Sequence, residues 1–139
     1  MKIENELRIG NYIQYMKDGY IKYDTVKSIY YDDELKIYRI ELNNRDFNLY
    51  HLTVNGINPI QLNIEILKKC GFKTQKEGLM TRYVADCSIK VEIGHDNIYT
   101  YLAYNDGCDG RWIFTKAKFL HQLQNLYYSI SGEELNITI

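Results

Sequence analysis

The residues of this chain with the chemistry for catalysis or metal binding are its histidines, cysteines and carboxylates. His51, His95 and His121 have neither the H-E-x-x-H pattern nor any paired spacing, so a zinc site would need them to converge through the fold. Glu133 and Glu134 are the densest carboxylate pair after the predicted C-terminal helix, where we expect a solvated tail rather than an acid–base pair. The sequence therefore predicts no catalytic residue, no metal site and no cofactor, and it favours a protein that is not an enzyme.

The cysteines point to no covalent or metal-bound framework. Cys70, Cys87 and Cys108 are odd in number and widely separated. They include no C-x-x-C pair, which argues against both disulfides and a zinc knuckle. We expect reduced thiols, with Cys70 packed at the end of a short helix.

Two Asp-Gly dipeptides within the segment 105–110 resemble part of a calcium-binding loop. When Gly110 is aligned with the glycine of an EF-hand loop, Gly107 stands where a ligand is needed, and Lys116 stands where the bidentate Glu should be. The pattern fails, so we predict a glycine-rich hairpin loop instead.

Aromatic and basic residues around that loop offer a different chemistry. Tyr99 and Tyr101 lie on one face of the preceding predicted strand, and Arg111 and Trp112 follow the loop. A guanidinium group and stacking surfaces suit an anionic aromatic ligand, so these four residues are the candidate site for a small nucleotide-type ligand. The chain has neither G-x-x-x-x-G-K-[ST] nor G-x-G-x-x-G, and packing of Trp112 in the core is the competing interpretation.

The C-terminal part of the chain predicts an amphipathic helix over 116–130, because its apolar residues recur at helical spacing. The opposite face of that helix brings His121, Gln124 and Tyr128 together at i, i+3 and i+7. We expect this face to be exposed to solvent. These three residues are the candidate partner-binding residues.

The remaining elements are strands and one more helix. Residues 1–57 are typical of a meander of short strands with an Asp-Gly hairpin turn. A short helix is predicted over 63–70, with Asn63 as its N-cap and Gly71 after its end. Alternating residues within 78–114 indicate a second β segment. We predict an α+β fold in which antiparallel sheets carry a short central helix and a C-terminal amphipathic helix.

The start of the meander suggests a more specific architecture. Its segments 9–13 and 26–29 resemble the beginning of an SH3-like barrel. Such barrels bind peptides or RNA, but the chain lacks a diagnostic set of ligand residues.

Composition limits the classes of function. With 139 residues, 45% hydrophobic and 25% charged, the chain is expected to form one globular domain over 1–139. Its net charge of −1 does not favour non-specific nucleic-acid binding or an anionic membrane surface. No signal-like or membrane-spanning apolar run is present, so we expect a soluble, cytoplasmic protein. The 14 tyrosines suit half-buried strand positions and binding surfaces alike.

Three blocks of sequence together resemble a family. They are 6–11, then 59–62 followed by Cys70-Gly71-Phe72, and the run HQLQNLYY from His121 that leads to Gly132-Glu133-Glu134-Leu135. In this order they resemble a group of small uncharacterised proteins found in Bacteroidetes and in the phages and prophages of those bacteria. The C-terminal block is the specific one. The resemblance implies an accessory role, including interference with bacterial immunity, and brings no known activity or catalytic residue.

Three functions follow as expectations. The first is a non-enzymatic phage or prophage accessory protein that binds a partner. The second is a sequestering protein that traps a nucleotide-type immune signal, and the third is a protein-binding adaptor or small phage assembly factor that uses a sheet edge or the His121/Tyr128 face.

Overall fold

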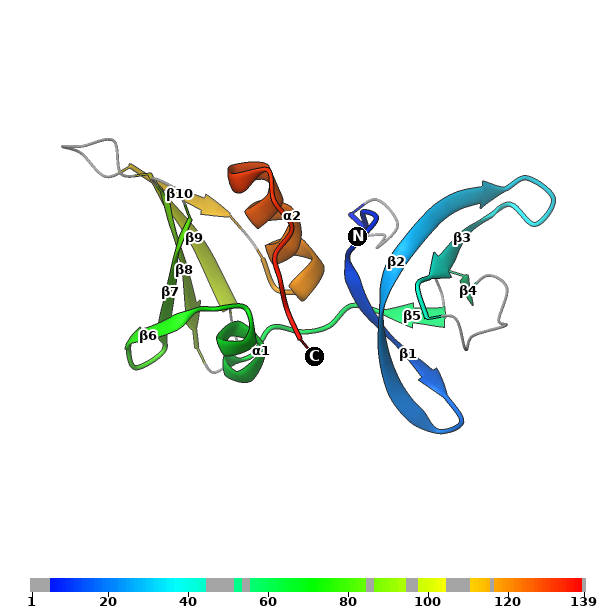
Figure 1. Ribbon diagram of the computed structural model, residues 1–139, viewed down its shortest axis with the longest axis horizontal. Coiled ribbons are helices and arrows are strands. Elements are labelled where there is room, and N and C mark those ends of the chain that lie inside the picture. Colours follow the sequence, from blue (N-terminus) through cyan, green and yellow to red (C-terminus); the bar gives the residue numbers. More distant parts are fainter. Residues whose placement is uncertain are drawn as a thin grey trace. The chain divides into compact units, whose positions relative to one another are not determined.

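The computed structural model describes residues 6–44, 52–53, 56–84, 87–94, 98–104, 111–115 and 117–138. Within these residues the protein has two antiparallel sheets and two helices (Figure 1). The chain divides into two compact units, 1–60 and 61–139, called unit 1 and unit 2 below. The predicted α+β class is confirmed, whereas the single domain over 1–139 stays a prediction.

Unit 1 contains one sheet with the strand order β4-β3-β2-β1-β5. Its strands are β1 (Tyr12–Lys17), β2 (Tyr20–Asp32), β3 (Ile37–Leu42), β4 (Leu52–Thr53) and β5 (Ile57–Asn58). Every neighbouring pair is antiparallel. Among the described residues the two ends of this order do not pair, so the SH3-like barrel is not confirmed.

The turn between β1 and β2 forms where the Asp-Gly pair predicts it. Asp18 and Gly19 have φ of 51° and 80°, and Lys17 pairs with Tyr20 across them. Two consecutive residues with positive φ define the type I′ turn, whose twist matches that of the flanking strands. Glycine accepts this conformation without steric cost, and aspartate tolerates it better than most residues.

β2 is the long strand that organises unit 1. It pairs with β1 over Tyr20–Thr25 and with β3 over Val26–Asp32. The register with β3 shifts between Val26 and Ser28, which is the signature of a bulge that bends a strand. Figure 1 shows β2 curving as it passes from one hairpin into the other.

The buried side chains of unit 1 lie on one face of the two hairpins. Val26 and Ile40 come from β2 and β3, and Ile13 and Tyr15 come from β1. Leu7 and Ile57 complete the cluster. Burial of an aliphatic or aromatic side chain contributes about 1.5–3 kcal/mol, so this cluster is the main source of stability for unit 1.

Unit 2 combines the second sheet with both helices. The strand order is β10-β9-β8-β7-β6. Its elements are α1 (Ile64–Lys69), β6 (Lys73–Lys76), β7 (Leu79–Val84), β8 (Cys87–Ile93), β9 (Ile98–Tyr104), β10 (Arg111–Thr115) and α2 (Leu120–Ser131). Burial alternates along β8, where Cys87, Ile89 and Val91 are buried, as the alternating sequence predicts.

The central helix α1 begins and ends as the sequence predicts. The Asn63 side chain accepts a hydrogen bond from the Ile66 N–H at 2.9 Å, which satisfies one of the unpaired donors of the first turn. Gly71 has φ of 82° after the C-cap Cys70, so the chain leaves the helix in the left-handed conformation that glycine favours.

The C-terminal helix α2 starts four residues later than predicted, and it ends at Gly132 with φ of 72°. The expectation that His121 and Gln124 face solvent is wrong, because they are only 1% and 2% exposed. Leu126, on the predicted core face, is only partly buried. Successive residues of a helix are about 100° apart, so the buried side of α2 is rotated from the predicted apolar face toward His121 and Gln124. Tyr128 is exposed, as predicted.

No helix in the described part of the chain has the length and apolar character needed to cross a bilayer.

The orientation of α2 gives the first testable prediction. We expect Leu120→Ala to lower the free energy of unfolding by about 2–5 kcal/mol, since Leu120 is fully buried and its loss leaves a cavity. Leu126→Ala, at a partly exposed position of the same helix, should cost clearly less. Urea unfolding followed by circular dichroism measures both values, and equal costs would contradict the observed orientation.

Candidate binding surface

The outer face of the β1–β2 hairpin, opposite the buried cluster, carries large apolar side chains exposed to solvent. Met16 is 58% exposed, Ile21 54% and Tyr23 47%. Met16 and Ile21 face each other across the two strands, and Gln14 faces Tyr23. An antiparallel sheet with one buried face normally presents polar residues on the other, so this apolar group needs an explanation.

This face also lacks charge. Strand alternation places on it every second residue of the hairpin, namely Tyr12, Gln14, Met16, Ile21, Tyr23 and Thr25. None of them is charged, although a quarter of all residues in the chain are. We call these six residues the outer face. Its composition resembles the centre of a protein interface, where aromatic residues and Met are enriched and charged residues are depleted.

Exposed tyrosines extend along the second hairpin of unit 1. Tyr31 and Tyr38 pair across β2 and β3, with ring centroids 5.1 Å apart and planes at 63°. This edge-to-face arrangement is favourable for aromatic rings. Both rings remain more than a third exposed, so the pair braces the hairpin while leaving phenol groups accessible.

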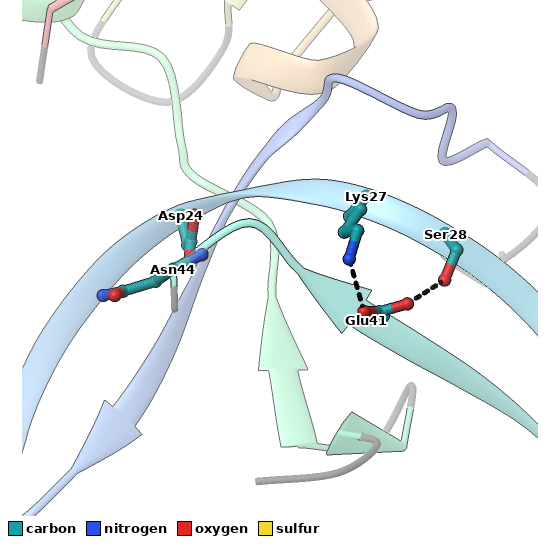
Figure 2. A network of polar contacts seen from close by, with 5 residues as sticks. All are labelled: Asp24, Lys27, Ser28, Glu41 and Asn44. Atoms are coloured by element: carbon teal, nitrogen blue, oxygen red, sulfur yellow. Dashed lines mark hydrogen bonds and ion pairs between the residues drawn. The ribbon is translucent and has the colours of Figure 1, made fainter. Parts of the chain in front are cut away.

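Two polar networks lie at the junction of β2 and β3 (Figure 2). Glu41 accepts from the Lys27 ammonium group at 2.8 Å and from the Ser28 hydroxyl at 2.9 Å. Lys27 and Glu41 are about half exposed, and Ser28 lies at the register shift of β2. A serine nucleophile needs a neighbouring base in water-excluded surroundings, so this exposed serine–carboxylate contact is better explained as a tie across the bulge.

The second network holds the chain as it leaves β3. Asp24 accepts from the Thr25 N–H at 2.7 Å and from the Asn44 N–H at 2.8 Å. Burial, followed by the nearby charge of Asp24, raises the pKa of Tyr15, and a hydrogen bond with Asn44 opposes this rise. Both carboxylate oxygens of Asp24 are thus used by backbone donors, which leaves the group a structural role.

A third polar site stabilises the turn between β2 and β3. Asp32 accepts from the N–H groups of Glu34 and Leu35 at 3.0 Å each, and its other oxygen lies 2.7 Å from Arg39 Nε. The Leu35 N–H is the main cause that holds the pKa of Asp32 below its usual value, with Arg39 and the Glu34 N–H acting in the same direction and desolvation opposing them.

Asp32 therefore gives a pH-dependent prediction. A lowered carboxyl pKa stabilises the folded state above the pKa of the unfolded chain, near 4, and this stabilisation is lost as pH falls through the folded pKa. Asp32→Asn should lower the urea midpoint at pH 7, with the difference from wild type shrinking below about pH 4. A difference that stays constant from pH 3 to pH 7 would show that the charge contributes nothing.

In unit 2, the Arg82 guanidinium on β7 joins both helices to the sheet. It donates to the Cys70 backbone oxygen at the end of α1. It also lies 4.8 Å from the ring centre of Tyr127 on α2 and 3.3 Å from its hydroxyl. A cation at a helix C-terminus is favourable, and a guanidinium over a phenol ring adds a cation–π contact. Sequence reasoning missed Arg82, because its partners lie 12 and 45 residues away in the chain.

The same surroundings make Cys70 unreactive. Burial raises the pKa of the Cys70 thiol to about 12, and the neighbouring Arg82 charge opposes this only in part. The thiolate is the reactive form. The expectation that Cys70 packs at the helix end is met, since its side chain is fully buried.

A thiol assay tests this assignment. In a variant that keeps only Cys70 (Cys87→Ala, Cys108→Ala), we expect reaction with an aromatic disulfide reagent at pH 8 to be roughly a thousandfold slower in the native state than in urea, because the thiolate fraction falls tenfold per pKa unit. Comparable rates in the two states would contradict the buried, protonated thiol.

The predicted nucleotide site spans two neighbouring strands. Tyr99 and Tyr101 belong to β9 and pair in register with Glu92 and Lys90 of β8. Arg111 and Trp112 belong to β10, where they pair in register with Tyr104 and Ala103 of β9. The four positions therefore lie on two neighbouring strands of one sheet. The glycine-rich loop 105–110 lies outside the described residues, and the nucleotide site stays a prediction.

Metal binding has no candidate in the described part of the chain, where histidine, cysteine, aspartate and glutamate form no group of three or more suited to an ion.

Comparison with known proteins adds no further assignment to this α+β protein: no family model, curated protein or solved structure matches the chain.

Proposed function

We propose that this protein is a non-enzymatic binding protein whose outer face on the β1–β2 hairpin takes a protein partner. The observation that carries the proposal is the contiguous exposure of Met16, Ile21 and Tyr23 on a face without charged residues. Covering such a face with a partner is favourable by roughly 25 cal/mol for each Å² of apolar surface removed from water.

The chemistry of the face favours a protein over the other ligand classes. Nucleic acid and anionic membranes are bound mainly through Lys and Arg, and the six residues of the outer face include neither. Tyrosine and methionine are typical anchors of protein interfaces, since both bury a large apolar area and tyrosine also offers a hydroxyl for hydrogen bonding. The partner is accordingly expected to offer an uncharged, apolar surface.

The polar groups of unit 1 support a non-enzymatic role. Asp24 and Asp32 are occupied by backbone donors, and Glu41 by Lys27 and Ser28. These groups fix the bend and the turn rather than polarise a substrate. The resemblance to small phage and prophage proteins makes an accessory role in those systems part of this proposal, with the partner supplied by the phage or by its host.

The experiment compares three tagged forms of the full chain. Wild type, the double variant Ile21→Ser/Tyr23→Ser and the control Tyr83→Ser are purified from native host cells, and recovered proteins are quantified by mass spectrometry. Tyr83 is a matched control because it is an 81% exposed tyrosine of a strand in unit 2. We expect a protein recovered with wild type and with the control to be lost with the double variant.

The recovered protein is then purified, and its affinity is measured by calorimetry. The two substitutions should weaken binding by at least about tenfold, the effect of losing ~1.4 kcal/mol of contact. Circular dichroism must show that the double variant melts like wild type. A partner that binds all three forms equally well would contradict the assignment of the outer face.

A further inference from the structure

We propose that the partner binds by adding an extended strand to the free edge of β2 at Ile21–Tyr23. This inference rests on the proposed function and specifies how the outer face is used. Strand addition joins backbone groups at a sheet edge and places alternate side chains of the incoming segment against the two faces of the sheet.

The direction of the backbone groups in β2 follows from the turn. Lys17 and Tyr20 flank a two-residue turn, and such a turn closes with a hydrogen bond between its flanking residues. Bonded and non-bonded pairs then alternate along an antiparallel ladder. Met16–Ile21 and Gln14–Tyr23 are therefore non-bonded pairs, so the N–H and C=O groups of Ile21 and Tyr23 point away from β1.

Hydrogen bonds further along β2 give the same direction independently. Val26 donates to the Asn11 oxygen at 2.9 Å and accepts from the Gly10 N–H at 2.8 Å, both on the side of β1. The Thr25 oxygen accepts from the Asn43 N–H at 3.1 Å, on the side of β3. The backbone groups of every second residue in a strand point to the same side. Those of Tyr23 and Ile21 therefore point, like those of Thr25, to the side of β3.

On that side, no described strand pairs with β2 beyond the end of β3. Leu42 is the last residue of β3 and pairs with Val26. The Asn43 and Asn44 N–H groups bond to the Thr25 oxygen and the Asp24 carboxylate. Among the described residues, none donates to or accepts from the backbone of Ile21 or Tyr23 on this side.

The sheet of unit 2 shows how an edge is protected in this protein. β6 is an edge strand in which all four residues are exposed, and it begins and ends with Lys73 and Lys76. Its register with β7 also shifts between Thr74 and Lys76. Lysines and irregular register both discourage the addition of another strand. The edge at Ile21–Tyr23 instead has a regular register and carries one lysine, Lys22, between two exposed apolar side chains.

Charge specifies the incoming strand further. Lys22 lies between Ile21 and Tyr23, so it belongs to the opposite face of the hairpin. Its side chain is exposed, and among the described residues no carboxylate forms an ion pair with it. The added strand that suits this edge best therefore places apolar side chains beside Ile21 and Tyr23 on the outer face. On the opposite face it places an acidic side chain near Lys22. The partner is an extended segment in which apolar and acidic residues alternate.

The test selects peptides from a random library of seven-residue sequences against three forms of the full chain: wild type, Lys22→Glu and Ile21→Ser/Tyr23→Ser. Circular dichroism establishes that each form is folded. We expect wild type to enrich peptides that alternate apolar and acidic residues, Lys22→Glu to enrich basic residues in place of the acidic ones, and the double variant to lose the apolar preference.

The best wild-type peptide is then resynthesised with one N-methyl group at each amide in turn. Because only alternate N–H groups of an added strand face the sheet, methylation of every second amide should weaken binding by about tenfold or more, a loss of ~1.4 kcal/mol. Methylation of the amides in between should change it by less than about threefold, a difference of roughly 0.7 kcal/mol.

Other results separate the failure of this inference from that of the proposed function. Binding that needs Ile21 and Tyr23 but tolerates methylation at every amide would leave the outer face as the binding surface and overturn strand addition. Self-association of wild type that the double variant abolishes, measured by sedimentation, would make a second copy the occupant and overturn the peptide partner. Equal enrichment on wild type and the double variant would contradict both proposals.

Discussion

A β-strand residue directs both of its backbone hydrogen-bonding groups to one side of the strand, and unit 1 is built around the consequence of that rule for β2. β2 pairs with β1 along its first half and with β3 along its second half. Val26 stands where the partners change. It is completely buried, and it bonds to Asn11 and Gly10 on the side of β1. The register shift that follows lets β2 turn from one hairpin into the other. Among the described residues, a strand shared in this way has no neighbour on the outward side of its first half.

The polar groups that look most suited to chemistry are the ones that hold these backbone irregularities. Asp24 satisfies donors where β3 ends, Glu41 spans the bulge, and Asp32 closes the turn between β2 and β3. Arg82 does the same for unit 2, where it satisfies an oxygen at the end of α1. Each occupied carboxylate or guanidinium removes a potential catalytic group from the surface. Among the described residues of unit 1, the large exposed side chains that these contacts leave without a role are apolar and aromatic, which supports the proposed binding role.

Local backbone structure could be predicted from the sequence where a few adjacent residues determine the backbone conformation. The Asp18-Gly19 turn, the Asn63 cap and the glycine after α1 are of this kind. The orientation of α2 could not be predicted, because the side of the helix that is buried is not the side with the most apolar residues. Gln124 is buried while Leu126 is partly exposed. Which face a helix buries depends on the neighbours that cover it, and these come from distant parts of the chain. The outer face was missed for a similar reason, because alternation in β1 and β2 does not reveal which of two mixed faces meets the core.

Core and surface positions can be told apart for the tyrosines whose burial the structure describes, a distinction that composition alone left open. Among the tyrosines whose burial is described, Tyr15 and Tyr127 are buried, whereas those exposed are Tyr20, Tyr23, Tyr30, Tyr31, Tyr38, Tyr83 and Tyr128. Five of these seven exposed residues lie on β2 and β3. A core role would bury these rings. Their exposure on the two hairpins that share β2 instead matches a surface that exchanges water for a partner, since a phenol ring loses little conformational entropy on binding and keeps a hydroxyl for hydrogen bonding.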